Sequence, residues 1–565
     1  MGGEGRGEEV PTNDQLKKTS RSEAPPSASR FASKLRWAVI IGISLLALLV
    51  RLPQLAERPM HTDEAVNAYL TGQLLDGEKY AYDPQDRHGP ALYFATLPIV
   101  RTAGATNLAD LSEAAVRMVP VIWGALTILL FAAVAGQTNL PTAAVAALLF
   151  AISPLPVYYN RYFIHETLFV AATLAFILSG WRALENKSLK AGIAAGLCAG
   201  FMLACKETAL LHFAAFGVAG LWWLFVRRSG SVELSGTTNP AVPGGEGAKF
   251  DPHLRSHFRR GLRWKPLGKI ILVSLAAFAV LVLALYTWGG QHWRGPLDLL
   301  QSFPRFAGRA SGEGHEKPFW YYLTLLGGGG SGWVVLALAA LGATGRPGSK
   351  TSDAVPPGIS PQRLFLQLLV TYAITISLIY SAIPYKTPWL ALNLWLPISV
   401  LAGFGFTALW QKCRGTLPRV AAILIGAIAL GWLGCDTWKW SFAKPADERN
   451  PYAYAHTGED LLRLPERLNQ LARQSNSGAA MRIAVVATDP WPLPWYLRKF
   501  NHAGFWQPDQ NPGEADVYIT SAEAAGTLSA RLNNWRPEFF GVRPEVLILL
   551  WTPPDSSQKP EPELK

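Results

Sequence analysis

The sequence predicts an all-α polytopic membrane protein of about eleven transmembrane helices, followed by a small α/β domain. Half of the 565 residues are hydrophobic, and only 16% are charged. Apolar runs of about 20 residues recur along the chain, and a helix of that length spans the hydrocarbon core of a bilayer. The formal net charge of +12 comes from basic residues spread over short loops between these runs. We therefore expect this charge to serve membrane insertion, with the lipid bilayer and no nucleic acid as partner.

The N-terminal part of the chain contains a polar tail and a first span. Residues 1–34 are rich in Gly, Glu, Pro and Ser, which predicts a disordered cytoplasmic tail. The first apolar run, residues 37–52, is long for a signal peptide and has no small-residue cleavage site, so we expect it to stay uncleaved. Further apolar runs lie near residues 114–135, 141–158, 163–181, 189–205, 208–226, 268–288, 319–342, 363–383, 388–409 and 418–438.

The loops predict the orientation of these spans. Cytoplasmic loops of membrane proteins are rich in Lys and Arg, and every second loop here has that composition. Residues 53–88 carry seven acidic and three basic residues instead. We predict a membrane domain over 35–440 with a first extracytoplasmic loop at 53–113 and a Gly/Ser/Pro-rich cytoplasmic linker at 227–267. The protein is expected in the plasma or inner membrane, with its N-terminus in the cytoplasm and its C-terminal domain outside.

The composition changes after the last span, where we predict an extracytoplasmic α/β domain over 441–555. Helical periodicity covers residues 458–474. Short runs rich in β-branched and aromatic residues predict strands at 482–487, 516–520 and 545–551.

Ionisable residues lie at the outer ends of the predicted spans, on the same side as the acidic pair Asp63-Glu64. They are Arg161, His165, Glu166, Lys206, Glu207 and Lys386. None is predicted at the middle of the bilayer, where an ion-coupled transporter would be expected to bury such groups. The pattern is typical of an enzyme that acts on a lipid headgroup at one membrane surface.

The charges suit glycosyl transfer from a polyprenyl-phosphate sugar. The leaving phosphate needs fixed cations, for which Arg161, Lys206 and Lys386 are the candidates. The acceptor hydroxyl needs a base, and Asp63 is our candidate, with Glu64 beside it. Thr62 is expected to cap a helix over 65–75, which would put Asp63 in the first turn, where the helix dipole favours the ionised form. Direct displacement by the acceptor would invert the anomeric configuration.

Several neighbouring side chains are candidates for substrate binding. They are His61, Asp83, His88, His165, Glu166 and Tyr385. We expect the residues of the first loop among them to form a hydrogen-bonded entrance, because their spacing matches no specific metal pattern. A divalent metal ion held by His61, Asp63 and His88 is the alternative, and no cofactor is required by the sequence. Trp491, Trp495 and Trp506 suit either stacking on sugars or packing in the core of the C-terminal domain.

The chain also resembles a known superfamily. An Asp-Glu pair in the first outer loop, followed by many spans, resembles the GT-C superfamily of membrane glycosyltransferases, which includes the protein O-mannosyltransferases and the lipid A aminoarabinose transferases. The resemblance is closer to the flippase-activity-associated family of predicted membrane glycosyltransferases. It rests on the runs at 61–65, 83–90, 160–166, 206–208, 385–389 and 489–496.

This resemblance implies a GT-C fold and a glycosyltransferase activity. It implies that Asp63, with Glu64 beside it, is the first-loop carboxylate that acts as catalytic base or positions the acceptor. It also implies that Arg161, Lys206 and Lys386 bind the phosphate of the lipid. The expected acceptor is a glycan, a lipid or a protein hydroxyl. Because the C-terminal domain does not resemble the β-trefoil of the O-mannosyltransferases, the resemblance argues against protein Ser/Thr as the acceptor. A flippase, or a flippase accessory protein, for lipid-linked sugars is the alternative function.

Overall fold

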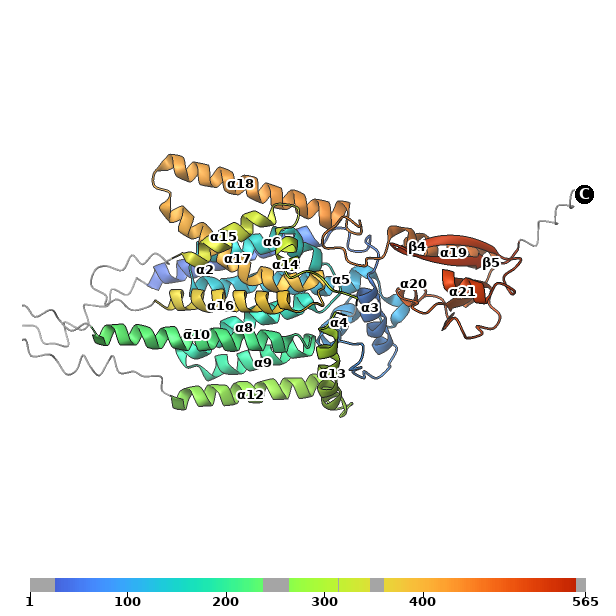
Figure 1. The fold of residues 1–565 in the computed structure, drawn as a ribbon, viewed down its shortest axis with the longest axis horizontal. Coiled ribbons are helices and arrows are strands. Elements are labelled where there is room, and N and C mark those ends of the chain that lie inside the picture. Colours follow the sequence, from blue (N-terminus) through green and yellow to red (C-terminus); the bar gives the residue numbers. More distant parts are fainter. Residues whose placement is uncertain (1–25, 237–263, 313, 346–359, 555–565) are drawn as a thin grey trace, which may run out of the picture.

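The computed structural model describes residues 26–236, 264–312, 314–345 and 360–554. Long helices lie side by side in a bundle, and a small sheet lies beyond one end of it (Figure 1). Most of the predicted tail and most of the predicted linker lie outside the described residues. Where the structure describes them, they are helical, because the first helix begins at Pro26 and another extends to Gly236.

The expectation of a multi-pass membrane protein is confirmed. In the described part of the chain, eight helices are long and apolar enough to cross a bilayer. They are α2 (Pro26–Arg51), α5 (Glu113–Gln137), α8 (Glu166–Asn186), α10 (Ala209–Gly236), α12 (Trp264–Tyr286), α16 (Pro361–Ala382), α17 (Ala391–Lys412) and α18 (Thr416–Trp438).

Three of the eleven predicted spans are not single long helices. One is split into α6 (Leu140–Ile152) and α7 (Pro154–Tyr159), because the ring of Pro154 ends the helical hydrogen bonding. The run at 189–205 forms α9 (Leu189–Cys205), which at 17 residues is shorter than the others. The third breaks into α14 (Tyr321–Gly327) and α15 (Gly332–Thr344), which meet at 109°. Within the residues that the structure describes, the number of long spans is therefore eight, or nine if this bent pair crosses the bilayer as one.

Glycine allows two of these shorter helices to pack closely. A Cβ on Gly196 of α9 would lie 2.0 Å from the Ser274 carbonyl oxygen of α12. A Cβ on Gly342 of α15 would lie 1.9 Å from the Leu401 carbonyl oxygen of α17. Such contacts between backbones are typical of small residues at membrane helix interfaces.

Short elements cover the end of the bundle that faces the sheet. The first loop forms α3 (Thr62–Leu75), α4 (Ala91–Thr102) and a 3-10 turn, η1 (Leu108–Asp110). Helix α13 (Gly295–Arg309) lies across the ends of the spans, nearly perpendicular to α12 (Figure 1). Two further turns, η2 (Pro388–Leu390) and η3 (Lys439–Ala443), lead into α17 and out of α18.

The C-terminal region is a five-stranded mixed sheet with helices. Its strand order is β2-β1-β3-β5-β4, with β1 parallel to β2 and β3, and β5 antiparallel to β3 and β4. The elements in chain order are η4 (Glu459–Leu462), α19 (Arg463–Gln474), η5 (Gly478–Ala480), β1 (Arg482–Val486), α20 (Leu493–Tyr496), β2 (His502–Trp506), β3 (Val517–Ser521), α21 (Ala522–Thr527), β4 (Arg536–Arg543) and β5 (Val546–Thr552).

The three strands expected from the sequence correspond to β1, β3 and β5, so these predictions are confirmed. The two edge strands, β2 and β4, were not predicted. Gly504 and Pro537 lower their apparent strand propensity, and both residues are tolerated at the edge of a sheet. One cluster of buried apolar side chains runs from Met60 and Val116 to Ile483 and Trp495, so the sheet packs directly on the first loop.

Candidate functional site

The N-terminus of α3 is held by a capping box. The His61 ring accepts a hydrogen bond from the Asp63 amide at 3.1 Å, and the Glu64 carboxylate accepts one from the His61 amide at 3.2 Å. The N-cap is therefore His61. The sequence had suggested Thr62 for this position. The cap fixes the first turn of α3, in which Asp63 and Glu64 lie.

Glu64 is fully buried among cations. Its carboxylate oxygens lie 2.8 Å from Nε and Nη2 of Arg117 and 3.2 Å from Nη2 of Arg58, and they accept the Phe163 amide at 2.9 Å. Burial alone would raise the pKa of Glu64, but the two arginines and the amide outweigh it and hold this pKa far below its usual value. Glu64 is thus a fixed anion that joins α3 to α5 and to the turn before α8.

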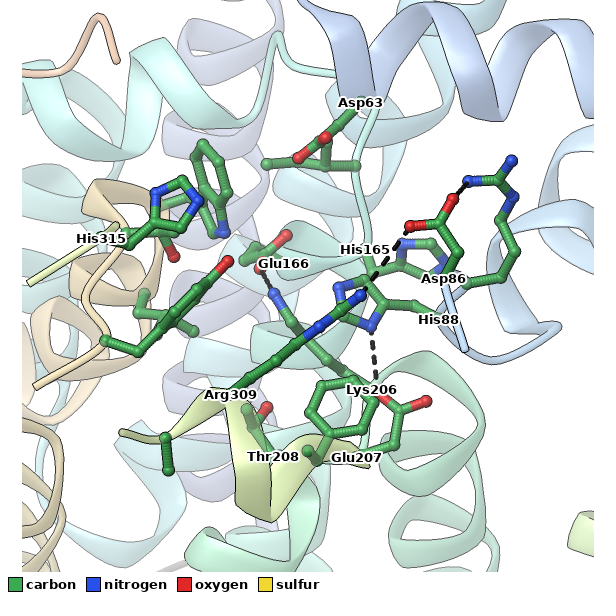
Figure 2. Close-up of a pocket in the computed structure, with 18 of the residues that line it drawn as sticks. Asp63, Asp86, His88, His165, Glu166, Lys206, Glu207, Thr208, Arg309 and His315 are labelled. Carbon is green, nitrogen blue, oxygen red and sulfur yellow. Dashed lines mark hydrogen bonds and ion pairs between the residues drawn. The ribbon is translucent and has the colours of Figure 1, made fainter. Parts of the chain in front are cut away.

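Asp63 is partly exposed and lines a cavity of about 680 Å³. The cavity lies between α3, the loop at 86–88, the turns before α8 and α10, α13 and the turn before η2. In Figure 2, Asp63 lies on the opposite side of the cavity from Lys206, Glu207 and Arg309. In the described part of the chain, the Asp63 carboxylate has no hydrogen-bond or ion-pair partner.

One wall consists of paired acids and bases from the ends of α8 and α9. Lys206 Nζ lies 2.5 Å from Glu166 Oε1, and His88 Nδ1 lies 3.0 Å from Glu207 Oε2. His165 contacts the carbonyl oxygen of Gly89 through Nε2 at 3.1 Å. Burial first, and then the charges of His88 and Lys206, lower the pKa of His165, which keeps its ring neutral near pH 7.

Arg309, at the end of α13, lines the cavity and contacts the first loop. Its Nη2 donates to the Gln85 carbonyl oxygen at 2.9 Å and lies 3.8 Å from Asp86 Oδ1. Asp86 is also paired with Arg87. This contact ties the interfacial helix to the first loop (Figure 2).

The remaining wall is aromatic and comes from late parts of the chain. Residues 315–317 and 384–386 pair as a short antiparallel ladder, which puts the rings of His315 and Tyr385 4.8 Å apart. The His315 ring is hydrogen-bonded to the Tyr454 hydroxyl. Tyr380 also lines the cavity, and its hydroxyl lies 2.6 Å from Nε2 of the buried His212.

The cavity collects six of the eleven side chains that the sequence proposed for catalysis, phosphate binding or substrate binding, and Glu207 and Trp491, which the sequence analysis also named, line it as well. The cavity is lined by Asp63, His88, His165, Glu166, Lys206 and Tyr385.

Five other predicted residues do not line the cavity. His61 and Glu64, at the start of α3, contact the Tyr454 carbonyl oxygen and the Phe163 amide instead of the cavity. The Asp83 carboxylate accepts the Gln85 amide at 2.8 Å within its own loop. Arg161 donates to the Gln54 carbonyl oxygen and lies over the Phe442 ring, while Lys386 donates to the carbonyl oxygens of Lys317 and Ile383. The side chains of Arg161 and Lys386 point away from the cavity because both residues lie in short turns. Their direction is therefore not set by a position on a helix face.

The sequence analysis proposed no site residue between Glu207 and Tyr385, and it therefore missed Arg309 and His315, both of which line the cavity. Arg309 and His315 lie in the segment after α12, which has no long apolar run. The signal that could have found Arg309 is the amphipathic pattern of α13. Leu297 and Leu300 are each 60% exposed, while Asp298 and Ser302 are buried on the opposite face.

A metal site has little support from the ligands present. Within the described residues, no group of three or more His, Cys, Asp or Glu side chains is arranged to hold a metal ion. The imidazoles of the proposed set are used elsewhere, because His61 contacts the Tyr454 carbonyl oxygen and His88 contacts Glu207.

Comparison with known proteins relates the fold of this chain to that of membrane glycosyltransferases. Residues 100–235 match the family model of the dolichyl-phosphate-mannose-protein mannosyltransferases. No curated protein matches the sequence significantly.

Solved structures match over most of the chain. ArnT from Cupriavidus metallidurans in the apo state is 13% identical, with a TM-score of 0.58 over 91% of this chain and 97% of ArnT. The same protein bound to undecaprenyl phosphate is 14% identical, with a TM-score of 0.57 over 91% and 98%. The oligosaccharyltransferase AglB from Archaeoglobus fulgidus, in complex with an inhibitory peptide and a dolichol-phosphate, is 13% identical, with a TM-score of 0.50 over 90% and 74%. The resemblance stated from the sequence is confirmed at the level of the fold, and this multi-pass membrane protein has the GT-C fold.

Proposed function

We propose that the chain is a glycosyltransferase that moves a sugar from a polyprenyl-phosphate donor to a cell-envelope hydroxyl on the extracytoplasmic face. The observation that carries this proposal is the cavity in which the unpaired carboxylate of Asp63 lies across from Lys206 and Arg309. A base on one side and cations on the other are what transfer from a phosphate leaving group requires. The solved structures of similar fold, bound to undecaprenyl phosphate and to a dolichol-phosphate, support this class of donor.

The phosphate is assigned to Lys206 and Arg309. Both line the cavity, whereas Arg161 and Lys386 do not. Lys206 is held by Glu166, and Arg309 by the loop at 85–86, so both cations are oriented before the donor arrives. As the bond from the anomeric carbon to the phosphate oxygen breaks, they stabilise the negative charge that develops on that oxygen.

Apolar residues beside these cations suit the lipid chain of the donor. Leu210 lines the cavity and is 44% exposed at the start of α10, where it faces the lipid-exposed side of the bundle. Phe303 and Phe306 of α13, together with Ile383, line the same region. The donor therefore enters sideways from the outer leaflet, with its phosphate at the level of α13.

Asp63 acts as the general base. The acceptor oxygen attacks the anomeric carbon, its proton passes to the Asp63 carboxylate, and the sugar–phosphate bond breaks on the opposite face of the ring. One displacement of this kind inverts the anomeric configuration. Glu64 does not exchange a proton; it holds the turn of α3 on which Asp63 is mounted.

The alternative, a flippase for lipid-linked sugars, has less support. In the described spans, Asp, Glu, Lys, Arg and His residues lie within about two turns of a helix end, away from the middle of the bilayer. The bend between α14 and α15 also lies near an end of the spans, because it is beside Asp436 at the end of α18 that faces the cavity. There the Ser331 hydroxyl donates to Asp436 at 2.5 Å.

The test is sugar transfer in proteoliposomes. Radiolabelled polyprenyl-phosphate sugars are incubated with a cell-envelope extract and either wild-type protein or Asp63→Asn. We expect labelled product from the wild type and a loss of about 10²–10⁴-fold in the variant, the range for removal of a general base. Asp509→Asn is the matched control, because Asp509 is exposed in the sheet region and does not line the cavity.

Two results would contradict the proposal. Labelled lipid that crosses the bilayer while no donor is consumed would establish the flippase. Full transfer activity in a folded Asp63→Asn protein would remove Asp63 from the role of base.

A further inference from the structure

The sheet region contributes directly to the cavity through one loop. Asp489 and Trp491, between β1 and α20, line the same cavity as Asp63. This loop leaves the sheet at the carboxyl end of β1, which lies between its parallel neighbours β2 and β3. In open α/β sheets, ligands bind at the carboxyl ends of strands where the strand order reverses direction, and β1 occupies that position here.

The loop is fixed to the membrane part of the protein. The Trp491 ring packs edge-on against Tyr69 of α3, with centroids 5.8 Å apart, and the Trp491 amide donates to the Asp489 carboxylate at 3.2 Å. A few residues further on, the Tyr496 hydroxyl accepts the Met60 amide at 2.8 Å. The cavity-facing side chains of the loop are therefore oriented without a ligand.

The chemistry of this loop suits a neutral sugar. The apolar face of an indole stacks on the C–H face of a sugar ring, and a carboxylate accepts hydrogen bonds from sugar hydroxyls. The Asp489 side chain is 51% exposed, and Arg543 lies 3.4 Å from it.

We infer that Asp489 and Trp491 form an acceptor subsite for a neutral saccharide, which makes the acceptor of the reaction a glycan hydroxyl. This inference rests on the proposed function for the identity of the bound sugar as acceptor. The subsite lies on the side of the cavity that belongs to the sheet region, and the phosphate of the donor is assigned to Lys206 and Arg309 from α9 and α13. Donor and acceptor would thus be bound by different parts of the chain.

The experiment measures binding separately from turnover. Full-length protein in nanodiscs is mixed with neutral tetrasaccharides of mannose, glucose or arabinose, or with a Ser/Thr peptide, and binding is followed by saturation-transfer NMR. We expect at least one tetrasaccharide to bind, and its Kd to rise about tenfold or more in Trp491→Ala and in Asp489→Asn. Trp491→Phe should restore part of the affinity, because it keeps an aromatic face.

Matched controls are Phe539→Ala and Asp509→Asn, which change an exposed aromatic and an exposed acid of the same sheet region away from the cavity. They should bind the saccharide as the wild type does. Unchanged saccharide binding in Trp491→Ala and Asp489→Asn, or binding of the peptide and of no saccharide, would overturn the inference.

A transfer assay with the same tetrasaccharides separates this inference from the proposed function. Transfer with an acceptor KM that neither variant changes would overturn the subsite and leave the glycosyltransferase standing. Saccharide binding that depends on both residues, without any transfer, would support the subsite and contradict the glycosyltransferase.

Discussion

Asp63 and Glu64 are neighbours with opposite surroundings. Successive residues of an α-helix project about 100° apart, so one can face a cavity while the next faces the protein interior. Asp63 lines the cavity, and Glu64 is fully buried against Arg58 and Arg117. The proposed base therefore owes its position to an acid that takes no part in the chemistry.

Removing the charge of Glu64 should destabilise the fold. Glu64→Gln leaves Arg58 and Arg117 buried without an anion, and breaking a buried ion pair costs about 3–5 kcal/mol. We expect a clearly lower melting temperature in detergent, measured by thermal aggregation. Glu57→Gln is the control, because Glu57 is an exposed acid in the same loop and the change should leave the melting temperature unaltered.

The effect of Glu64 should depend on pH in one direction. Its pKa is lowered in the folded protein, so its stabilising contribution is complete above its unfolded pKa of about 4.3 and is lost as pH falls toward the folded value. The difference in melting temperature between wild type and Glu64→Gln should be constant from about pH 6 to pH 8 and shrink in strong acid. A difference that grew toward acid pH would contradict the assignment.

The two cavity cations should act on the donor alone. Lys206→Met and Arg309→Met each remove a charged contact to the phosphate, and such contacts contribute about 1.5–3 kcal/mol. We expect the donor KM to rise by about tenfold or more and kcat to fall, with the acceptor KM unchanged, in steady-state transfer assays. Lys499→Met and Arg294→Met, on exposed positions outside the cavity, are the matched controls. A change in acceptor KM alone would show that the phosphate binds elsewhere.

At the level of elements, apolar runs predict where helices lie but not where they break. The run at 141–158 reads as one span, although Pro154 divides it into α6 and α7. The run at 319–342 contains four consecutive glycines, two of which, Gly329 and Gly330, adopt positive φ at the bend between α14 and α15. Hydropathy averages over such positions, because the side chains on both sides are equally apolar.

Helix α13 should lie in the membrane interface. Trp293 is 76% exposed, and the exposed side chains Leu297 and Leu300 lie on one face of a helix that crosses the ends of the spans. A spin label at Leu300→Cys, in a background without the native cysteines, should collide with oxygen dissolved in lipid more than with a water-soluble nickel complex. A label at Asp509→Cys in the sheet region should show the reverse. Equal exposure of both labels to nickel would remove α13 from the bilayer surface.

At the level of the whole molecule, α3 and α13, which line the cavity, and the sheet lie at the same end of the bundle (Figure 1). Trp495 Nε1 donates to Glu113 at 2.7 Å, and the Thr457 hydroxyl donates to the Met60 carbonyl oxygen at 2.7 Å. These contacts attach the sheet region to the loop that holds Asp63. The side of the membrane on which the sheet lies is thus the side on which the proposed reaction would take place.

We predict that this side is extracytoplasmic. The four native cysteines, Cys198, Cys205, Cys413 and Cys435, are free and are first replaced. In intact cells, a membrane-impermeant maleimide should label Asp509→Cys, while Asn186→Cys, at the Lys/Arg-rich end of α8, should be labelled only after lysis. The opposite pattern would invert the orientation and place the transfer in the cytoplasm.

The sequence predicted about half of the candidate site. The sequence located Glu166 and Lys206 because each lies at the end of an apolar helix. Glu166 is at the start of α8, and Lys206 is at the end of α9. Arg161 was misplaced because the turn before α8 reverses direction between it and His165. Arg309 was missed because an amphipathic helix at a membrane surface has no long apolar run.

The walls of the cavity also have an order of synthesis. Asp63, His165 and Lys206 are made early, Arg309 and Tyr385 later, and Asp489 and Trp491 near the end. At ordinary translation speeds, roughly half a minute or more separates the first wall from the last. During synthesis, the carboxylate of Asp63 and both proposed phosphate cations, Lys206 and Arg309, are therefore made before the residues of the proposed saccharide subsite.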